Sequence, residues 1–127
     1  MSEHVVTKPS PRPVAETVAR LEAVVADKGL KLFAVVDHSR EAEAHGLELR
    51  ETSVVIFGSP VAGTPVMQAA PLAALDLPLK VLVWDDDGQT RLAYTPPAEL
   101  AARYDLDEEL TARFAGIDAV TDAAVAG

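Results

Sequence analysis

A hairpin signal around Gly88 constrains the fold of this chain more than any other feature. The apolar, β-rich runs 79–84 and 90–94 flank the turn sequence Asp86-Asp87-Gly88-Gln89. An Asp-Gly pair between two such runs predicts an antiparallel hairpin, because a tight turn needs residues that tolerate positive φ. The fold therefore contains at least one antiparallel strand pair.

Helical patterns occupy much of the rest of the chain. Apolar residues recur at helical spacing from residue 13 to residue 28, and Gly29 follows as a stop signal. Further helical segments are predicted over residues 65–75, 98–104 and 108–124. Pro71 lies inside the first of these segments, which predicts a kink or two short turns there.

Three more segments have strand character. Val5-Val6-Thr7 can form an edge strand or a flexible lead-in, and residues 30–36 form a short β-rich run. Residues 52–57 are apolar almost throughout, which is typical of a strand buried on both faces. A hairpin beside helical crossovers predicts an α+β fold, a single domain with a mixed or mostly antiparallel sheet and helices packed on one face.

Length and composition narrow the classes of function. The 127 residues suit one domain, and the formal net charge of −9 disfavours nucleic acid and anionic membrane surfaces as partners. The chain has no cysteine, which excludes disulfides, zinc–thiolate sites and iron–sulfur clusters. With no long apolar run and no signal-peptide pattern, we expect a cytoplasmic protein.

The segment Gly58-Ser-Pro-Val-Ala-Gly-Thr-Pro65 has the strand–loop–helix context of a phosphate-binding P-loop. The P-loop chemistry needs a lysine and a Ser/Thr hydroxyl after the second glycine, but Thr64 and Pro65 occupy those positions. Thr64 as helix N-cap and Pro65 as first helical residue explain the same letters as a structural turn. We therefore predict a turn and no nucleotide site.

A helix N-terminus at this point could still hold a small anion through its free N–H groups. The candidate ligand-binding residues for this hypothesis are Gly58, Gly63, Thr64, Val66 and Met67. Capping without a ligand is the simpler interpretation, and both stay open.

His38 is the candidate catalytic residue, because it ends a predicted strand beside Asp37, and imidazole is a frequent acid or base. Ser39 is a suitable cap for a brief helix that follows. Glu41 and His45 share one side of that helix and could complete a metal site with His38. Local hydrogen bonding is the favoured explanation of these residues, so no metal and no cofactor are predicted.

Met67, Leu72 and Leu75 could form an exposed apolar stripe near the predicted kink. Such a stripe would argue for a partner subunit.

The chain also resembles a known family. The segments "LKLFAVVDHS", "VVIFGSPVAGTPVMQAAPLAALDLPLKVLVWDDDG" and "RLAYTPPAELAARYDL" are similar to the bacterial and archaeal family called domain of unknown function 302. The resemblance implies a small α+β domain that forms dimers, with no established catalytic residue or cofactor. On this basis residues 14–106 form the family-like core, residues 1–12 a lead-in and residues 107–127 a C-terminal helical extension.

We therefore expect a cytoplasmic binding or interaction module that acts as a homodimer, and no catalysis is evident from the sequence. The alternative is an enzyme or ligand-binding protein that holds a small anionic molecule between His38 and the helix N-terminus at residues 58–65.

Overall fold

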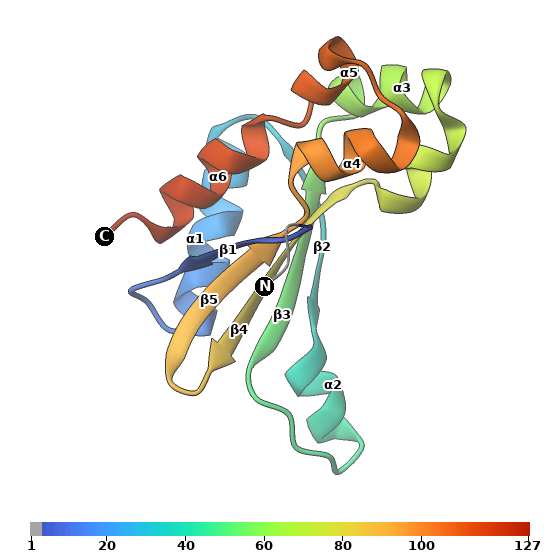
Figure 1. Cartoon of the computed structure of the whole chain (residues 1–127). Helices are drawn as coiled ribbons and strands as arrows, with labels where there is room; N and C mark the ends of the chain where they lie inside the picture. The colour runs from blue at the N-terminus through green and yellow to red at the C-terminus, as the bar shows by residue number, and fades with distance from the viewer. Residues whose placement is uncertain (1–3) are drawn as a thin grey trace.

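The computed structural model describes residues 4–127 and has an α+β architecture (Figure 1). The strands are β1 (Val6–Pro9), β2 (Lys31–Asp37), β3 (Thr52–Gly58), β4 (Leu79–Asp86) and β5 (Gln89–Tyr94). The helices are α1 (Val14–Asp27), α2 (His38–Ala44), α3 (Pro60–Ala69), the 3-10 helix η1 (Pro71–Asp76), α4 (Pro97–Tyr104), α5 (Glu108–Ala112) and α6 (Gly116–Val125). The first three residues of the expected lead-in lie outside the described part.

The strands form one sheet in the order β1-β5-β4-β3-β2, and every neighbouring pair is antiparallel. The predicted hairpin is confirmed: Asp87 and Gly88 connect β4 to β5 with φ angles of 51° and 94°. The Gly88 N–H donates to Asp85 Oδ1 at 2.7 Å, which stabilises the turn. Of the two predictions for the N-terminal segment, an edge strand or a flexible lead-in, the structure has the edge strand, Val6–Pro9.

Helices α1 and α6 cover one face of the sheet. α1 packs against β2, β3 and β4, and α6 packs against α1 (Figure 1). The core between these layers is apolar and contains Val14, Val18, Leu21, Val25, Val55, Phe57, Val81, Val83, Leu92, Tyr94, Ile117, Val120 and Ala124. The helical periodicity predicted for α1 is therefore confirmed, because its stripe is the part that enters the core.

Gly29 ends α1 as the sequence suggests. Its φ of +71° lies in the left-handed region, and the N–H of Leu30 reaches back to the Val25 carbonyl at 3.0 Å. This is a Schellman-type ending that satisfies a terminal carbonyl and turns the chain into β2.

Residues 107–127, expected as an extension, take part in the core through α6. Lys8 on β1 anchors that helix: its Nζ donates to Thr121 Oγ1 at 2.7 Å and to Asp122 Oδ1 at 2.8 Å. The same ammonium lies 5.1 Å from the centroid of the Tyr94 ring. The N-terminal strand and the C-terminal helix thus hold each other against β5.

The remaining helices lie at the two ends of the sheet. α3, η1, α4 and α5 gather at one end, while α2 lies at the other (Figure 1). The first group has its own apolar cluster around Val66, Ala73, Leu100 and Phe114. The break between α3 and η1 agrees with the kink predicted from Pro71.

The prediction that residues 52–57 are buried on both faces is wrong for the single chain. Val55 and Phe57 are 0% and 1% exposed, whereas Val54 and Ile56, which alternate with them along the strand, are only partly buried. The physical reason is that α1 and α6 cover only the face to which Val55 and Phe57 point. Across residues 4–127, none of the helices combines the length and apolar character needed to cross a bilayer.

Candidate functional site

The helix after β3 begins earlier than the sequence suggests. Ser59 is the N-cap, its Oγ accepts the Ala62 N–H at 3.2 Å, and Pro60 is the first helical residue. This corrects the assignment of Thr64 as the cap and Pro65 as the first residue. Ser59-Pro60 carries the same cap-and-proline signal five positions upstream. The helix continues through Pro65, although proline has no N–H to donate to the Val61 carbonyl four residues earlier.

This shift removes the predicted anion cradle. Thr64, Val66 and Met67 lie inside α3 and not at its first turn. Thr64 is exposed, and Val66 is fully buried in the cluster beneath α3. Met67 instead turns toward a cavity that also borders Gly58 and Gly63.

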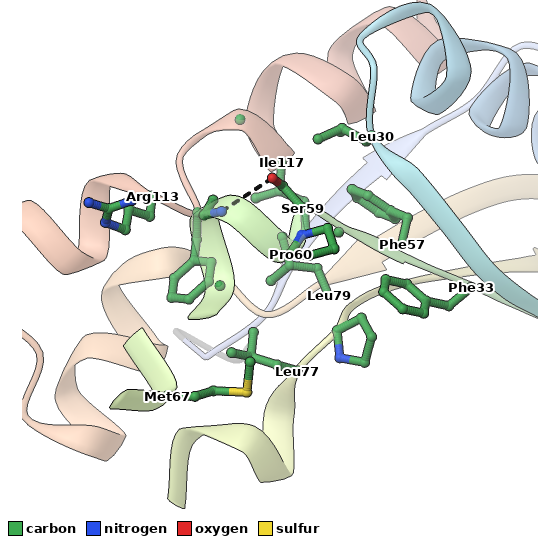
Figure 2. A pocket seen from close by; sticks show the side chains of 16 residues that line it. Leu30, Phe33, Phe57, Ser59, Pro60, Met67, Leu77, Leu79, Arg113 and Ile117 are labelled. Atoms are coloured by element: carbon green, nitrogen blue, oxygen red, sulfur yellow. Dashed lines mark hydrogen bonds between the residues drawn. The ribbon is translucent and has the colours of Figure 1, made fainter. Parts of the chain in front are cut away.

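That cavity has a volume of about 120 Å³ and lies where β3 passes into α3 (Figure 2). Phe57 and Leu79 form its wall on the sheet, and Met67 and Leu77 close it on the side of α3 and η1. Ile117 from α6 also lines the cavity. The glycine loop therefore lines an apolar cavity instead of a phosphate site.

Other contributors come from distant parts of the sequence. Leu30 and Phe33 border the cavity from the start of β2, and Arg113 and Phe114 from the connection between α5 and α6. Arg113 supplies the one charged side chain among the described lining residues; it is exposed, and Figure 2 draws its guanidinium at the rim, on the side away from the apolar side chains. No local motif could have marked these residues, because only tertiary folding brings them together.

His38 lies far from this cavity. In the antiparallel β2–β3 pair, Lys31 is opposite Gly58 and Asp37 is opposite Ser53. His38 directly follows Asp37, so the length of a seven-residue strand, about 20 Å at about 3.3 Å per residue, separates it from the glycine loop. The hypothesis that one small molecule contacts both His38 and residues 58–65 is therefore contradicted by the strand direction.

The residues around His38 are explained by local bonding. Asp37, and not Ser39, caps α2: its Oδ1 accepts the Arg40 N–H at 2.9 Å and the Ser39 hydroxyl at 2.7 Å. The hydrogen bond from the Ser39 hydroxyl, and to a lesser extent that from the Arg40 N–H, lowers the pKa of Asp37 below its ordinary value. The cap therefore stays ionised and keeps its negative charge at the helix start.

The proposed metal ligands do not assemble. His38, Glu41 and His45 are all exposed, and His45 Nδ1 lies 3.0 Å from the Glu41 carbonyl oxygen. Within residues 4–127, no group of three His, Cys, Asp or Glu side chains is arranged to hold a metal ion.

A polar network ties η1 to α4 beside the apolar cluster. Tyr104 Oη donates to Asp76 Oδ2, and Arg103 Nη1 lies 2.8 Å from the same oxygen. The hydrogen bond from Tyr104, followed by that from Arg103, lowers the pKa of Asp76 below its ordinary value. This network secures the helices at the end of the sheet where the cavity lies.

The comparison with protein families identifies the group to which the chain belongs. The family model described as "Domain of unknown function DUF302" matches residues 6–124. The chain belongs to this family. The match includes β1 and nearly all of α6, and so extends on both sides beyond the expected core of residues 14–106.

Relatives of this DUF302 chain include longer proteins. It is 39% identical over 121 residues to the protein named fluoride-specific ion channel FluC 1 of Brucella suis, covering 91% of this chain and 48% of that protein. The identity to the FluC 2 protein of Brucella melitensis is also 39%, over 45% of its length. The chain thus spans about half the length of these curated relatives.

A solved structure shows the same fold. The uncharacterized conserved DUF302 protein from Bacillus stearothermophilus superimposes with a TM-score of 0.81 at 20% sequence identity. The match covers 98% of this chain and 97% of that one.

Proposed function

We propose that this DUF302 domain is a non-catalytic binding and interaction module that works as a homodimer. The interface in this proposal is the sheet face away from α1 and α6. We call it the open face, and its apolar members are Val36, Val54, Ile56, Leu82 and Trp84.

The observation that carries the proposal is that both faces of the central strands are apolar, whereas the helices of one chain cover a single face. In β3, Val55 and Phe57 point into the core, and Val54 and Ile56 point the other way. An antiparallel sheet with a solvated face ordinarily alternates apolar with polar residues. A strand that is apolar on both sides fits an assembly in which the second face is also buried.

The charges on the open face are compatible with a second acidic chain. The net charge is −9, so two copies repel each other over most of their surface. The open face carries Lys80 and Arg91, and its carboxylate Asp86 is paired with Arg91 Nε at 2.7 Å. Two copies can therefore meet at this face without an unpaired carboxylate between them.

The size of the face suits an interface between two copies. Five strands about 4.8 Å apart and about 23 Å long present on the order of 500 Å². Two copies would bury about 1,000 Å² in total, near the lower limit of specific interfaces. An isologous contact of this kind closes as a two-fold dimer, the commonest symmetry of soluble oligomers.

A second apolar surface competes with this assignment. Leu72 and Leu75 on η1 are 70% and 75% exposed, as the predicted stripe requires, but Met67 faces the cavity instead. The open face has more apolar members, and they lie on paired strands that are already ordered. Less side-chain and backbone entropy is then lost on association.

The test compares two valine substitutions on opposite sides of the sheet. Val54→Lys places a charge on the open face, whereas Val35→Lys places it at a 38% exposed position on the other side of edge strand β2. We expect the Val54→Lys protein to sediment as a monomer and the Val35→Lys protein to remain a dimer, with equal far-UV circular dichroism. Equal association of both variants would contradict the proposed interface.

The Brucella relatives favour a second candidate function, an accessory domain for a fluoride channel. The supporting observation is the 39% identity over a domain-length half of proteins that carry the channel name. The test is fluoride efflux from vesicles that hold the Brucella suis protein without its matched half, with and without this chain added. Restored efflux would favour the accessory role, and unchanged efflux would count against it.

We also propose a cytoplasmic location, which is consistent with a chain that contains no cysteine for disulfides. No cofactor and no metal form part of the proposed function.

A further inference from the structure

We infer that the cavity between β3, α3 and α6 is a binding site for a small amphipathic carboxylate, with an apolar ring or branched chain inside and the anionic group at Arg113. Neither the family description nor the names of the relatives assign a ligand to this part of the fold.

The glycines around the cavity are the first observation. Of the seven glycines in the sequence, Gly29, Gly46 and Gly88 have positive φ and serve turns. Gly58, Gly63 and Gly116 border the cavity, and none of them has a positive φ.

At Gly63 the absence of a side chain, and not backbone freedom, is the property that matters for the cavity. Gly63 lies inside α3, where glycine is a poor helix former. A Cβ at Gly63 would come within 4 Å of the Met67 methyl group alone, at 3.9 Å, whereas a Cβ at Gly58 would pack on Pro78 Cβ at 3.6 Å and Gly116 is exposed to solvent. Gly63 thus leaves open a space beside Met67 that a larger side chain could have filled.

The size and lining of the cavity define the apolar part of the ligand. The volume of about 120 Å³ is close to that of an apolar protein cavity of about 150 Å³ that binds benzene. Aromatic and aliphatic side chains such as Phe57, Leu79 and Ile117 form its walls. One six-membered ring, or a branched chain of similar volume, fits these dimensions.

The charges around the cavity define the polar part. The sequence contains 20 Asp and Glu residues, yet none of them is among the described lining residues. Arg113 is exposed at the rim of the cavity, and within residues 4–127 its guanidinium has neither an ion pair nor a hydrogen bond. Lys31 adds a second cation near the lining, with its Nζ 5.2 Å from the centroid of the Phe33 ring. A carboxylate is the group that an unpaired guanidinium binds with two parallel hydrogen bonds.

This inference is independent of the proposed dimer. Phe57 and Ile117 belong to the core on the helix-covered side of the sheet, so the cavity does not open onto the open face. Loss of self-association and loss of ligand binding can therefore be measured separately.

The experiment titrates the full chain with three probes and follows amide and methyl signals by nuclear magnetic resonance. Benzoate carries ring and carboxylate, benzamide carries the ring without charge, and acetate carries the carboxylate without the ring. We expect benzoate to shift the signals of Gly63, Met67 and Ile117 in a saturable manner. Benzamide should bind at least about fivefold more weakly, because a charge-assisted hydrogen bond is roughly twice as strong as a neutral one. Acetate should not saturate these signals.

Two variants and a control assign the contacts. Gly63→Leu fills the cavity, and we expect it to abolish benzoate and benzamide binding while its Tm is equal to or above that of the wild type. Arg113→Gln should remove the preference for benzoate over benzamide and leave benzamide binding intact. Arg40→Gln on α2, at the opposite end of the sheet, makes the same charge change and should leave both affinities unaltered.

Several results would overturn the inference. One is the absence of saturable shifts at the lining residues with benzoate up to about 20 mM, which corresponds to negligible affinity. Unchanged benzoate binding in Gly63→Leu would place the ligand elsewhere. Equal affinities for benzoate and benzamide in the wild type, or an undiminished preference in Arg113→Gln, would remove the assignment of the carboxylate to Arg113.

Discussion

The two faces of the central strands differ in what covers them, although their sequences are similarly apolar. On the helix-covered face, Val55 and Phe57 are 0% and 1% exposed. On the open face, Val54 and Ile56 from the same strand are only half-buried. The comparison teaches that an apolar pattern shows that a face is to be buried, but not whether the same chain or another one buries it.

The cavity lies at one end of the covered face, where that core meets the second apolar cluster. Ile117 belongs to the main core, Phe114 belongs to the cluster under α3 and η1, and both border the cavity. The covered face therefore combines a closely packed centre with an open space at its end, whereas the open face presents side chains without a cover.

The largest expected difference between the faces concerns folding stability. Phe57→Ala removes a buried ring, and we expect the free energy of unfolding to fall by about 3–5 kcal/mol. Ile56→Ala, on the adjacent open-face residue, should lower it by less, about 1–2 kcal/mol, because that side chain is only partly buried. Urea denaturation in a monomeric Leu82→Glu background makes the comparison free of association. Equal losses would show that the two faces are equally buried within one chain.

The next largest effect concerns association. Leu82→Glu places a charge in the centre of the open face, and we expect dimer affinity to fall by about 2–4 kcal/mol, as for central interface residues. Light scattering after size exclusion gives the masses across a concentration series. Leu72→Asp on η1 is the matched control and should leave the dimer intact. If Leu72→Asp dissociates the dimer and Leu82→Glu does not, the interface lies on the stripe at η1.

A smaller effect distinguishes the two kinds of glycine. Gly63→Ala should raise the free energy of unfolding by about 0.5–1 kcal/mol, because alanine is the better helix former and its Cβ has room. Gly29→Ala should lower it by about 1–2 kcal/mol, since its φ of +71° strains any residue with a Cβ. Thermal denaturation measures both changes. A destabilising Gly63→Ala would mean that the space beside α3 is not open.

The smallest expected effect depends on pH. Because the pKa of Asp76 is lowered in the folded state, its contribution is fully present above the ordinary carboxyl pKa. That contribution is lost as the pH falls through the lower folded value. We expect Asp76→Asn to reduce stability by about 0.5–1 kcal/mol at neutral pH, after allowance for partial exposure.

The difference between Asp76→Asn and wild type should shrink as the pH falls below the ordinary carboxyl pKa, and it should vanish once the pH is below the lowered pKa of the folded state, because the wild-type carboxyl is then protonated as well. Denaturant titrations at neutral and acidic pH provide the check. A difference that persists unchanged in acid would show that the network stabilises the helices through packing and not through charge.

Much of the fold is predictable because its signals are local. The periodic stripe of α1, the stop at Gly29 and the Asp87-Gly88 turn each depend on residues close in sequence. The sequence alone does not place the start of α3, because Ser59-Pro60 and Thr64-Pro65 carry the same cap signal; in the fold Ser59 is the cap and Val66 is buried in the second apolar cluster. A proline in the second turn of a helix is tolerated when such packing compensates for the missing hydrogen bond.

The site was less predictable, because it depends on strand direction and on distant residues. His38 and Gly58 each adjoin a strand end, but antiparallel pairing sends those ends to opposite edges of the sheet. Arg113 and Ile117 lie 48 and 52 residues beyond Pro65, the end of the glycine loop, and no spacing links them to it. Of the candidate ligand-binding residues, Gly58, Gly63 and Met67 do border the cavity.

Sedimentation equilibrium of the wild-type chain tests most directly the claim that a second copy covers the open face. The measurement covers concentrations from about 1 to about 100 µM, a range in which weak dimers dissociate and re-form. If a second copy covers the open face, the apparent mass rises to that of two chains, and the emission of Trp84, the one tryptophan in the sequence, shifts to shorter wavelength along with it. A mass of one chain throughout, with Trp84 emission independent of concentration, would contradict the account.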